Sequence, residues 1–141
     1  MPLVAQTQTV SLLFGPASEE AATQAAAGAA QRVTAWLAKP GRAVEVRRAG
    51  SRDGQELLKF MKPPVIEKTL LDAAREARGE AETPYLNAME IASYSLSRAK
   101  GAKVLVTLLQ VPQWTPNGVA RLKQILDDCQ SKSIKVVAVE L

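Results

Sequence analysis

The stretch Gln8-Thr9-Val10-Ser11-Leu12-Leu13-Phe14 leads through Gly15-Pro16-Ala17 into Ser18 and an alanine-rich segment. A short apolar run that ends at Gly-Pro predicts a buried strand. Ser18 is a favourable N-cap, so we expect a helix over Ala17 to Ala38. In open α/β sheets the carboxyl end of such a strand is where ligands bind, which makes this junction the first place to look for function.

The rest of the chain alternates between strand and helix patterns. Apolar runs or alternating residues predict four further strands, at Arg42 to Ala49, Glu56 to Met61, Lys103 to Leu109 and Ile134 to Leu141. Helical spacing predicts helices at Val65 to Arg78, after Thr83-Pro84 and after Thr115-Pro116. This order predicts an α/β fold of three layers, with a mainly parallel sheet of about five strands and helices on both faces. The continuous apolar runs 103–109 and 134–141 are typical of strands buried on both faces.

Composition sets broad limits on what the chain does. Its 141 residues fit one domain over residues 1–141, and 47% apolar residues suffice for a core. There is no histidine, which removes the commonest general base and metal ligand, and the only cysteine, Cys129, lies on a predicted apolar helix stripe. The N-terminal residues lack the pattern of a signal peptide, and no apolar run is long enough to span a membrane.

The loop after the first strand lacks the residues of a phosphate or nucleotide site. Phe14-Gly15-Pro16-Ala17-Ser18 contains a single glycine and no carboxylate, and the helix that follows begins with Glu19 and Glu20. Acidic side chains suit a helix N-terminus but would repel a phosphate bound there. We therefore expect neither a nucleotide nor another cofactor at this position.

Several stretches together resemble a von Willebrand factor type A domain, and most closely the bacterial branch of related domains from acidobacterial proteins. The likeness rests on four segments: 37–46 after the first helix, 57–60 with 70–74, the helix start at 82–88, and the closing pair 122–129 with 133–139. The resemblance implies a protein-interaction domain of the same α/β fold. It also leaves the chain as a minimal or C-terminally truncated member, and it is compatible with export of a longer precursor.

The resemblance implies that the family's metal-ion-dependent adhesion site is degenerate here. That site requires Asp-x-Ser-x-Ser after the first strand, a threonine before the third helix, and a later aspartate. Only Ser18 and Thr83 match, while Phe14 and Gln110 stand where aspartates are needed. A hard cation such as Mg²⁺ needs carboxylate oxygens, so we expect no metal to bind.

The residues that gather at the carboxyl ends of the two central strands are the candidates for binding a partner. They are Phe14, Ser18, Thr83, Tyr85, Gln110 and Trp114. Aromatic residues are frequent interface anchors, but the same aromatics would serve equally to fill the crevice that metal and water occupy in the family. For Ser18 and Thr83 the simpler interpretation is helix capping.

We thus expect a non-catalytic domain that binds another protein of unknown identity. One alternative is a Rossmann-like domain for a small molecule or nucleotide. Another is weak nucleic-acid binding through the basic segment 39–52, whose cations are Lys39, Arg42, Arg47, Arg48 and Arg52. That segment has no interleaved aromatic for base stacking, so a charged edge strand explains it more simply.

Overall fold

The computed structural model describes residues 8–47, 55–58, 61–77, 82–110 and 115–141. Within these residues four strands run parallel: β1 (Gln8–Phe14), β2 (Arg42–Arg47), β4 (Ala102–Leu109) and β5 (Ile134–Glu140). The short strand β3 (Gln55–Leu57) pairs antiparallel to β2, which gives the order β3-β2-β1-β4-β5. The expected α/β class with a largely parallel sheet is confirmed.

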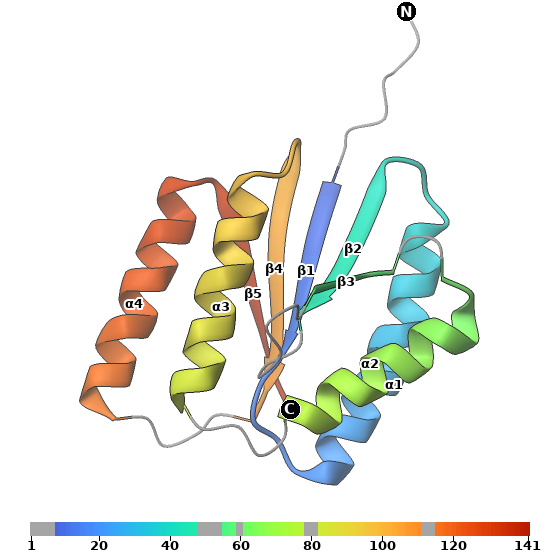
Figure 1. The fold of residues 1–141 in the computed structure, drawn as a ribbon, viewed down its shortest axis with the longest axis horizontal. Helices are drawn as coiled ribbons and strands as arrows, with labels where there is room; N and C mark the ends of the chain where they lie inside the picture. Colours follow the sequence, from blue (N-terminus) through green and yellow to red (C-terminus); the bar gives the residue numbers. More distant parts are fainter. Residues whose placement is uncertain (1–7, 48–54, 59–60, 78–81, 111–114) are drawn as a thin grey trace, which may run out of the picture.

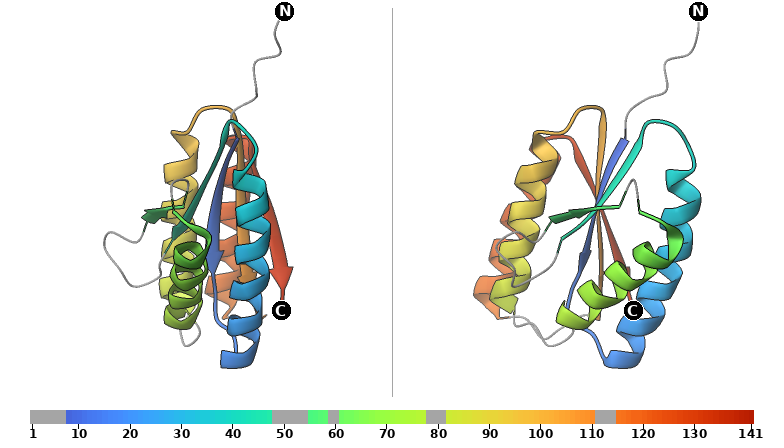
Figure 2. Two further views of the ribbon diagram at one scale, coloured as in Figure 1. Left: turned by 90° about the vertical axis from the view of Figure 1, so that its right-hand side faces the viewer. Right: turned by 45° about the vertical axis from the view of Figure 1, so that its right-hand side comes forward.

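Helices lie on both faces of the sheet, and the three layers are visible in Figure 1 and Figure 2. On one face, α1 (Glu19–Leu37) and α2 (Pro63–Ala77) form a core with the even-numbered residues of β1. On the other face, α3 (Glu82–Ser97) and α4 (Pro116–Ser131) form a second core with Leu13 and with odd-numbered residues of β4. This division follows from the alternation of side chains along a strand.

Small residues let α1 approach its neighbours closely. Ala22, Ala26 and Ala30 are buried at helical spacing, and Ala73, Ala74 and Ala77 are buried on α2 beside them. The predicted cap at Ser18 is confirmed, and the helix start predicted at Thr115-Pro116 is confirmed with Thr115 as its cap. Their side chains accept hydrogen bonds from the Ala21 and Gly118 amides at 3.2 and 3.1 Å, so each satisfies an amide that has no partner within its helix.

Two details of the sequence interpretation are wrong. The helix expected over Val65 to Arg78 begins two residues earlier, at Pro63, because proline is tolerated in the first turn of a helix. The strand over 134–141 was expected to be buried on both faces, but β5 lies at the edge of the sheet and most of it is exposed or half-buried. Its apolar side chains, Val137 among them at 36% exposure, remain accessible on the face that carries α1.

Candidate functional site

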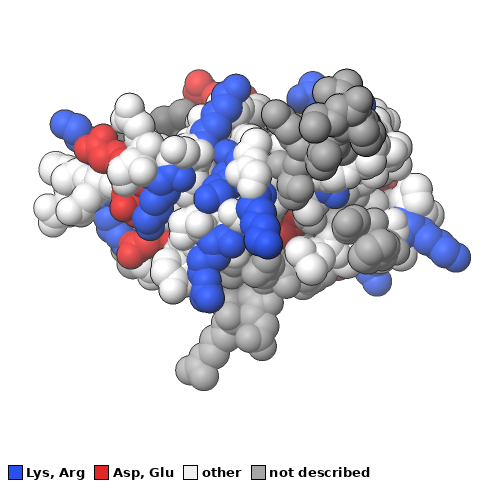
Figure 3. All heavy atoms as spheres, turned by 90° about the horizontal axis from the view of Figure 1, so that it is seen from above, with Lys and Arg blue, Asp and Glu red and all other residues white. Residues whose placement is uncertain are grey.

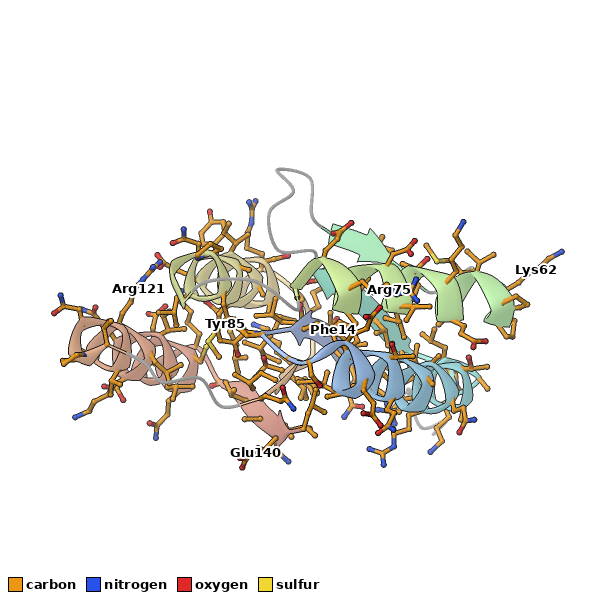
Figure 4. The ribbon with its side chains drawn as sticks, turned by 90° about the horizontal axis from the view of Figure 1, so that it is seen from below. Phe14, Lys62, Arg75, Tyr85, Arg121 and Glu140 are labelled. Atoms are coloured by element: carbon orange, nitrogen blue, oxygen red, sulfur yellow. The ribbon has the colours of Figure 1, made fainter. Side chains whose placement is uncertain are left out.

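The carboxyl ends of β1 and β4 form the topological switch point of the sheet. The two strands are neighbours, and the helices that follow them, α1 and α4, lie on opposite faces. Ligands of open α/β sheets bind in the crevice that such a divergence creates. Figure 4 looks at this edge and shows Phe14 from β1 and Tyr85 from α3 near the centre of the molecule.

The described part of this edge is filled by the chain itself. A Cβ atom added at Gly15 would lie 2.8 Å from the Cβ of Leu109 and 2.8 Å from Cε2 of Tyr85. The Tyr85 ring therefore packs directly on the backbone that leaves β1, and it is 2% exposed. Only glycine allows so close an approach, which explains why Gly15 stands at the end of this strand.

Tyr85 is held in this position by a buried hydrogen bond. Its hydroxyl lies 2.6 Å from the hydroxyl of Thr107 on β4, and both residues are buried. Burial raises the pKa of the Tyr85 phenol, while the hydrogen bond with Thr107 opposes part of that rise. The neutral phenol thus anchors α3 to the centre of the sheet.

Hydrogen bonds also join the two loops at this edge. The side-chain oxygen of Gln110 accepts a hydrogen bond from the backbone amide of Ser18 at 2.7 Å. The backbone amide of Gln110 donates to the backbone carbonyl of Pro16 at 2.8 Å. Gln110 therefore joins the loop after β4 to the start of α1. Its neutral oxygen lies at the helix end where an anion would otherwise bind.

The six predicted partner-contacting residues are thus placed differently from one another. Phe14 and Tyr85 are each 2% exposed and belong to the two cores, which fits the interpretation that aromatics fill the crevice. Ser18 and Gln110 lie together at the surface edge, joined as described. The Thr83 side chain and Trp114 lie outside the described residues.

An apolar groove among the described residues lies away from this edge. This groove of about 470 Å³ runs along α1 on its own face of the sheet. From α1 it is lined by Ala25, Gly28, Ala29, Arg32, Val33 and Trp36. From the sheet it is lined by Val10 and Leu12 of β1, Val44 of β2, Val106 and Leu108 of β4, Val137 and Val139 of β5, and Leu141 after β5. Its volume is in the range of ligand sites, and among the described residues that line it Arg32 alone is charged.

This groove exists because the described helices α1 and α2 cover β1 and β2 on this face but cover β4 and β5 only in part. Sequence reasoning missed it, since the apolar pattern of β5 suggested burial on both faces. A signal was available in Gly28, a glycine in the middle of a helix, which costs about 1 kcal/mol relative to alanine. Nothing lies within 4 Å of a Cβ added there, so no described contact requires a glycine at this position.

Several cations of the described residues lie at the opposite edge, where the parallel strands begin, and Figure 3 looks at this edge. Arg42, Lys103 and Lys135 lie at or near the starts of β2, β4 and β5, and α1, α3 and α4 end at the same edge. Cations near helix C-termini are favoured by the helix dipole. The guanidinium of Arg42 lies 4.9 Å from the centre of the Trp36 ring, where a cation–π interaction holds it.

The basic segment 39–52 does not form one patch among the described residues. Arg42 and Arg47 occupy opposite ends of β2, which at the usual rise of a strand places their backbones roughly 17 Å apart. Arg48 and Arg52 lie outside the described residues. Lys39 and Arg42 instead belong with the cations at the amino ends of the strands.

One buried carboxylate was not anticipated. Glu45 on β2 is 4% exposed and pairs in register with Ser11 on β1, which is also buried. The alternation of Val44 and Val46 indicated only that Glu45 lies on the opposite face. Within the described residues no group of three or more His, Cys, Asp or Glu side chains could hold a metal ion, and no helix could span a membrane.

No family model matches the chain, and no curated protein matches it. Among solved structures, it is similar to the crystal structure of the SpRpn10 VWA domain, with a TM-score of 0.45 and 14% sequence identity. The match covers 96% of this chain and 89% of that chain. The likeness concerns the fold alone and says nothing of a partner or a metal.

Two glycines provide a matched test of the packing described above. We expect Gly15→Ala to destabilise the protein by about 1 to 3 kcal/mol, because its Cβ would collide with Leu109 and Tyr85. Gly28→Ala should stabilise it by about 1 kcal/mol, because alanine favours the helix and meets no neighbour. Urea unfolding of both variants measures the two effects, and equal changes would contradict the close approach at Gly15.

The buried phenol predicts a loss of stability in alkali. Because the folded-state pKa of Tyr85 is raised, the folded state keeps this proton while the unfolded chain loses it above about pH 10. The unfolded state then binds fewer protons, so the free energy of unfolding falls as the pH rises past that value. Tyr85→Phe should cost about 1 to 3 kcal/mol at neutral pH, by leaving the Thr107 hydroxyl without its partner.

The same substitution should make the decline above pH 10 shallower, as urea unfolding at pH 8 and at pH 10.5 would show. Tyr94→Phe is the control, since Tyr94 is 60% exposed and its ring is solvated in both states. A decline that is equally steep in Tyr85→Phe and in the native sequence would show that Tyr85 does not contribute to it.

Proposed function

We propose that this chain is a non-catalytic domain that binds another protein, without a functional metal site, and that it does so through the apolar groove beside α1. The observation that carries the proposal is the apolar surface along β4 and β5, where buried Leu108 and half-buried Val106 adjoin the more accessible Val137, Val139 and Leu141. Apolar surfaces of this kind, bordered by polar side chains, are typical of interaction sites.

The filled switch point supports the same function. A small substrate or nucleotide on this fold would be expected between the ends of β1 and β4, but Tyr85 and Leu109 pack there against Gly15. The Gln110 side chain meets the start of α1. The chemistry of the sequence agrees, since it offers no histidine and no glycine-rich phosphate loop. Membership of the von Willebrand type A group, with a degenerate adhesion site, is part of this proposal.

A protein that works without a metal should be indifferent to divalent cations. We expect millimolar Mg²⁺, Mn²⁺ or Ca²⁺ to leave the thermal unfolding temperature unchanged, because Phe14 and Gln110 provide no carboxylate. Differential scanning calorimetry with each cation measures this. A saturable rise in the unfolding temperature that Ser18→Ala abolishes would establish a metal site and refute this part of the proposal.

The groove itself can be tested by affinity capture with a matched pair of variants. Gly28→Gln projects a side chain into the groove, whereas Ala27→Gln adds the same side chain to an exposed position of α1 that does not line it. In lysate of the source organism, we expect the native chain and Ala27→Gln to retain the same proteins and Gly28→Gln to lose them. Retention of the same proteins by all three baits would place the interface elsewhere.

A further inference from the structure

The shape of the groove specifies one kind of occupant. The residues of α1 that line it run from Ala25 to Trp36, about three turns or roughly 16 Å of helix. Beneath α1 the floor of the groove reaches β1 and β2. Its open part lies over two neighbouring strands, β4 and β5, and at about 4.8 Å per strand this part is about 10 Å wide. An α-helix with its side chains has this same width, so the open face offers a seat for one helix beside α1.

The wall of the groove allows a helix to approach closely. Ala25, Gly28 and Ala29 lie at successive helical positions on the side of α1 that borders the groove. Small residues on facing helices permit short distances between helix axes. Gly28 weakens α1 and meets nothing within 4 Å of an added Cβ, and the backbone of a neighbouring helix would give it a packing role.

The charge of the groove restricts the occupant further. Arg32 on α1 is exposed and lines the groove, and none of the described residues that line it is acidic. Lys135 is exposed as well, and by strand alternation it lies on the same face of β5 as Val137 and Val139. Two cations thus border an apolar floor, from α1 on one side and from β5 on the other.

We propose that the groove binds an amphipathic helix of a partner protein, with apolar side chains on one face and acidic side chains at its flanks. The apolar face, with residues at i, i+3, i+4 and i+7, packs on β4 and β5. The acidic residues lie beside Arg32 and Lys135, where opposite charge steers association and fixes orientation. This inference rests on the proposed function and names the chemistry of its partner.

A helix accounts for these features better than an added strand does. An extra strand would pair with the backbone at the free edge of β5 and would leave the floor beside α1 uncovered. It would also give no role to Gly28 or Arg32, which both belong to α1.

Selection from a displayed library of random peptides of about 16 residues tests the proposal, since this length forms four turns. The native chain is the target, and peptides that also bind Gly28→Gln are removed. We expect the enriched sequences to share apolar residues at helical spacing together with Asp or Glu. A synthetic peptide of the consensus sequence should become helical on binding, as circular dichroism would show.

Its affinity should fall about tenfold in Arg32→Glu, through charge repulsion, and at least as much in Gly28→Gln. Ala27→Gln and Lys123→Glu are the controls, with exposed positions that do not line the groove, and each should bind within about twofold of the native chain. Thermal unfolding of each variant confirms that it is folded before binding is measured.

Other results would overturn the proposal. Enriched peptides with alternating apolar residues would indicate strand addition to β5. A dimer in analytical ultracentrifugation that Gly28→Gln dissociates would make a second copy the occupant, and saturable binding of dodecanoate without any selected peptide would indicate a small amphiphile. Absence of all binding would refute a helix as well. If the native chain still captures proteins that Gly28→Gln loses, each of these results would refute only the helical partner. The proposed function, protein binding through the groove, would then stand.

Discussion

The contact between the Tyr85 ring and the backbone at Gly15 is the constraint on which the rest of the structure depends. It brings α3 against the end of β1, and the hydroxyl of Tyr85 continues inward to Thr107 on β4. One side chain thereby joins a helix to both central strands. The position that a ligand would take in other sheets of this topology is used for internal packing, so the architecture of a binding crevice is kept while its space is filled.

With that crevice filled, an apolar surface remains exposed on the face of β4 and β5 beside α1. Each face of a sheet must be covered by a helix or by a partner, because its apolar side chains are otherwise left in water. Here α3 and α4 cover one face from β1 to β5. On the other face α1 and α2 bury residues of β1 and β2 together with Leu108 of β4, but leave Val106 and the apolar residues of β5 only partly covered. The described helices therefore do not bury all of the apolar residues that β4 and β5 place on this face.

The sequence predicted the elements better than it predicted their surroundings. Periodicity and turn residues located every strand and helix, and the caps at Ser18 and Thr115 follow from side-chain chemistry that acts within a few residues. Burial depends on contacts between distant segments. The apolar pattern of β5 is the same whether a helix covers one face or two, and Phe14 and Tyr85 are aromatic whether they fill a crevice or contact a partner. The pairing of Ser18 with Gln110, ninety-two positions apart, could not be read from local pattern either.

The exposed apolar side chains of β5 also affect how this edge strand meets other chains. An edge strand with apolar side chains favours association with other chains unless charges interrupt it, and lysine is the residue that edge strands commonly use for this. Lys135 interrupts β5 only near its start, and Val136, Val137, Ala138 and Val139 follow without a charge. A helix seated against α1 would cover this strand's exposed face and place its own polar side toward solvent. Occupation of the groove would thus bury the apolar face of this edge strand, and binding and solubility would depend on the same surface.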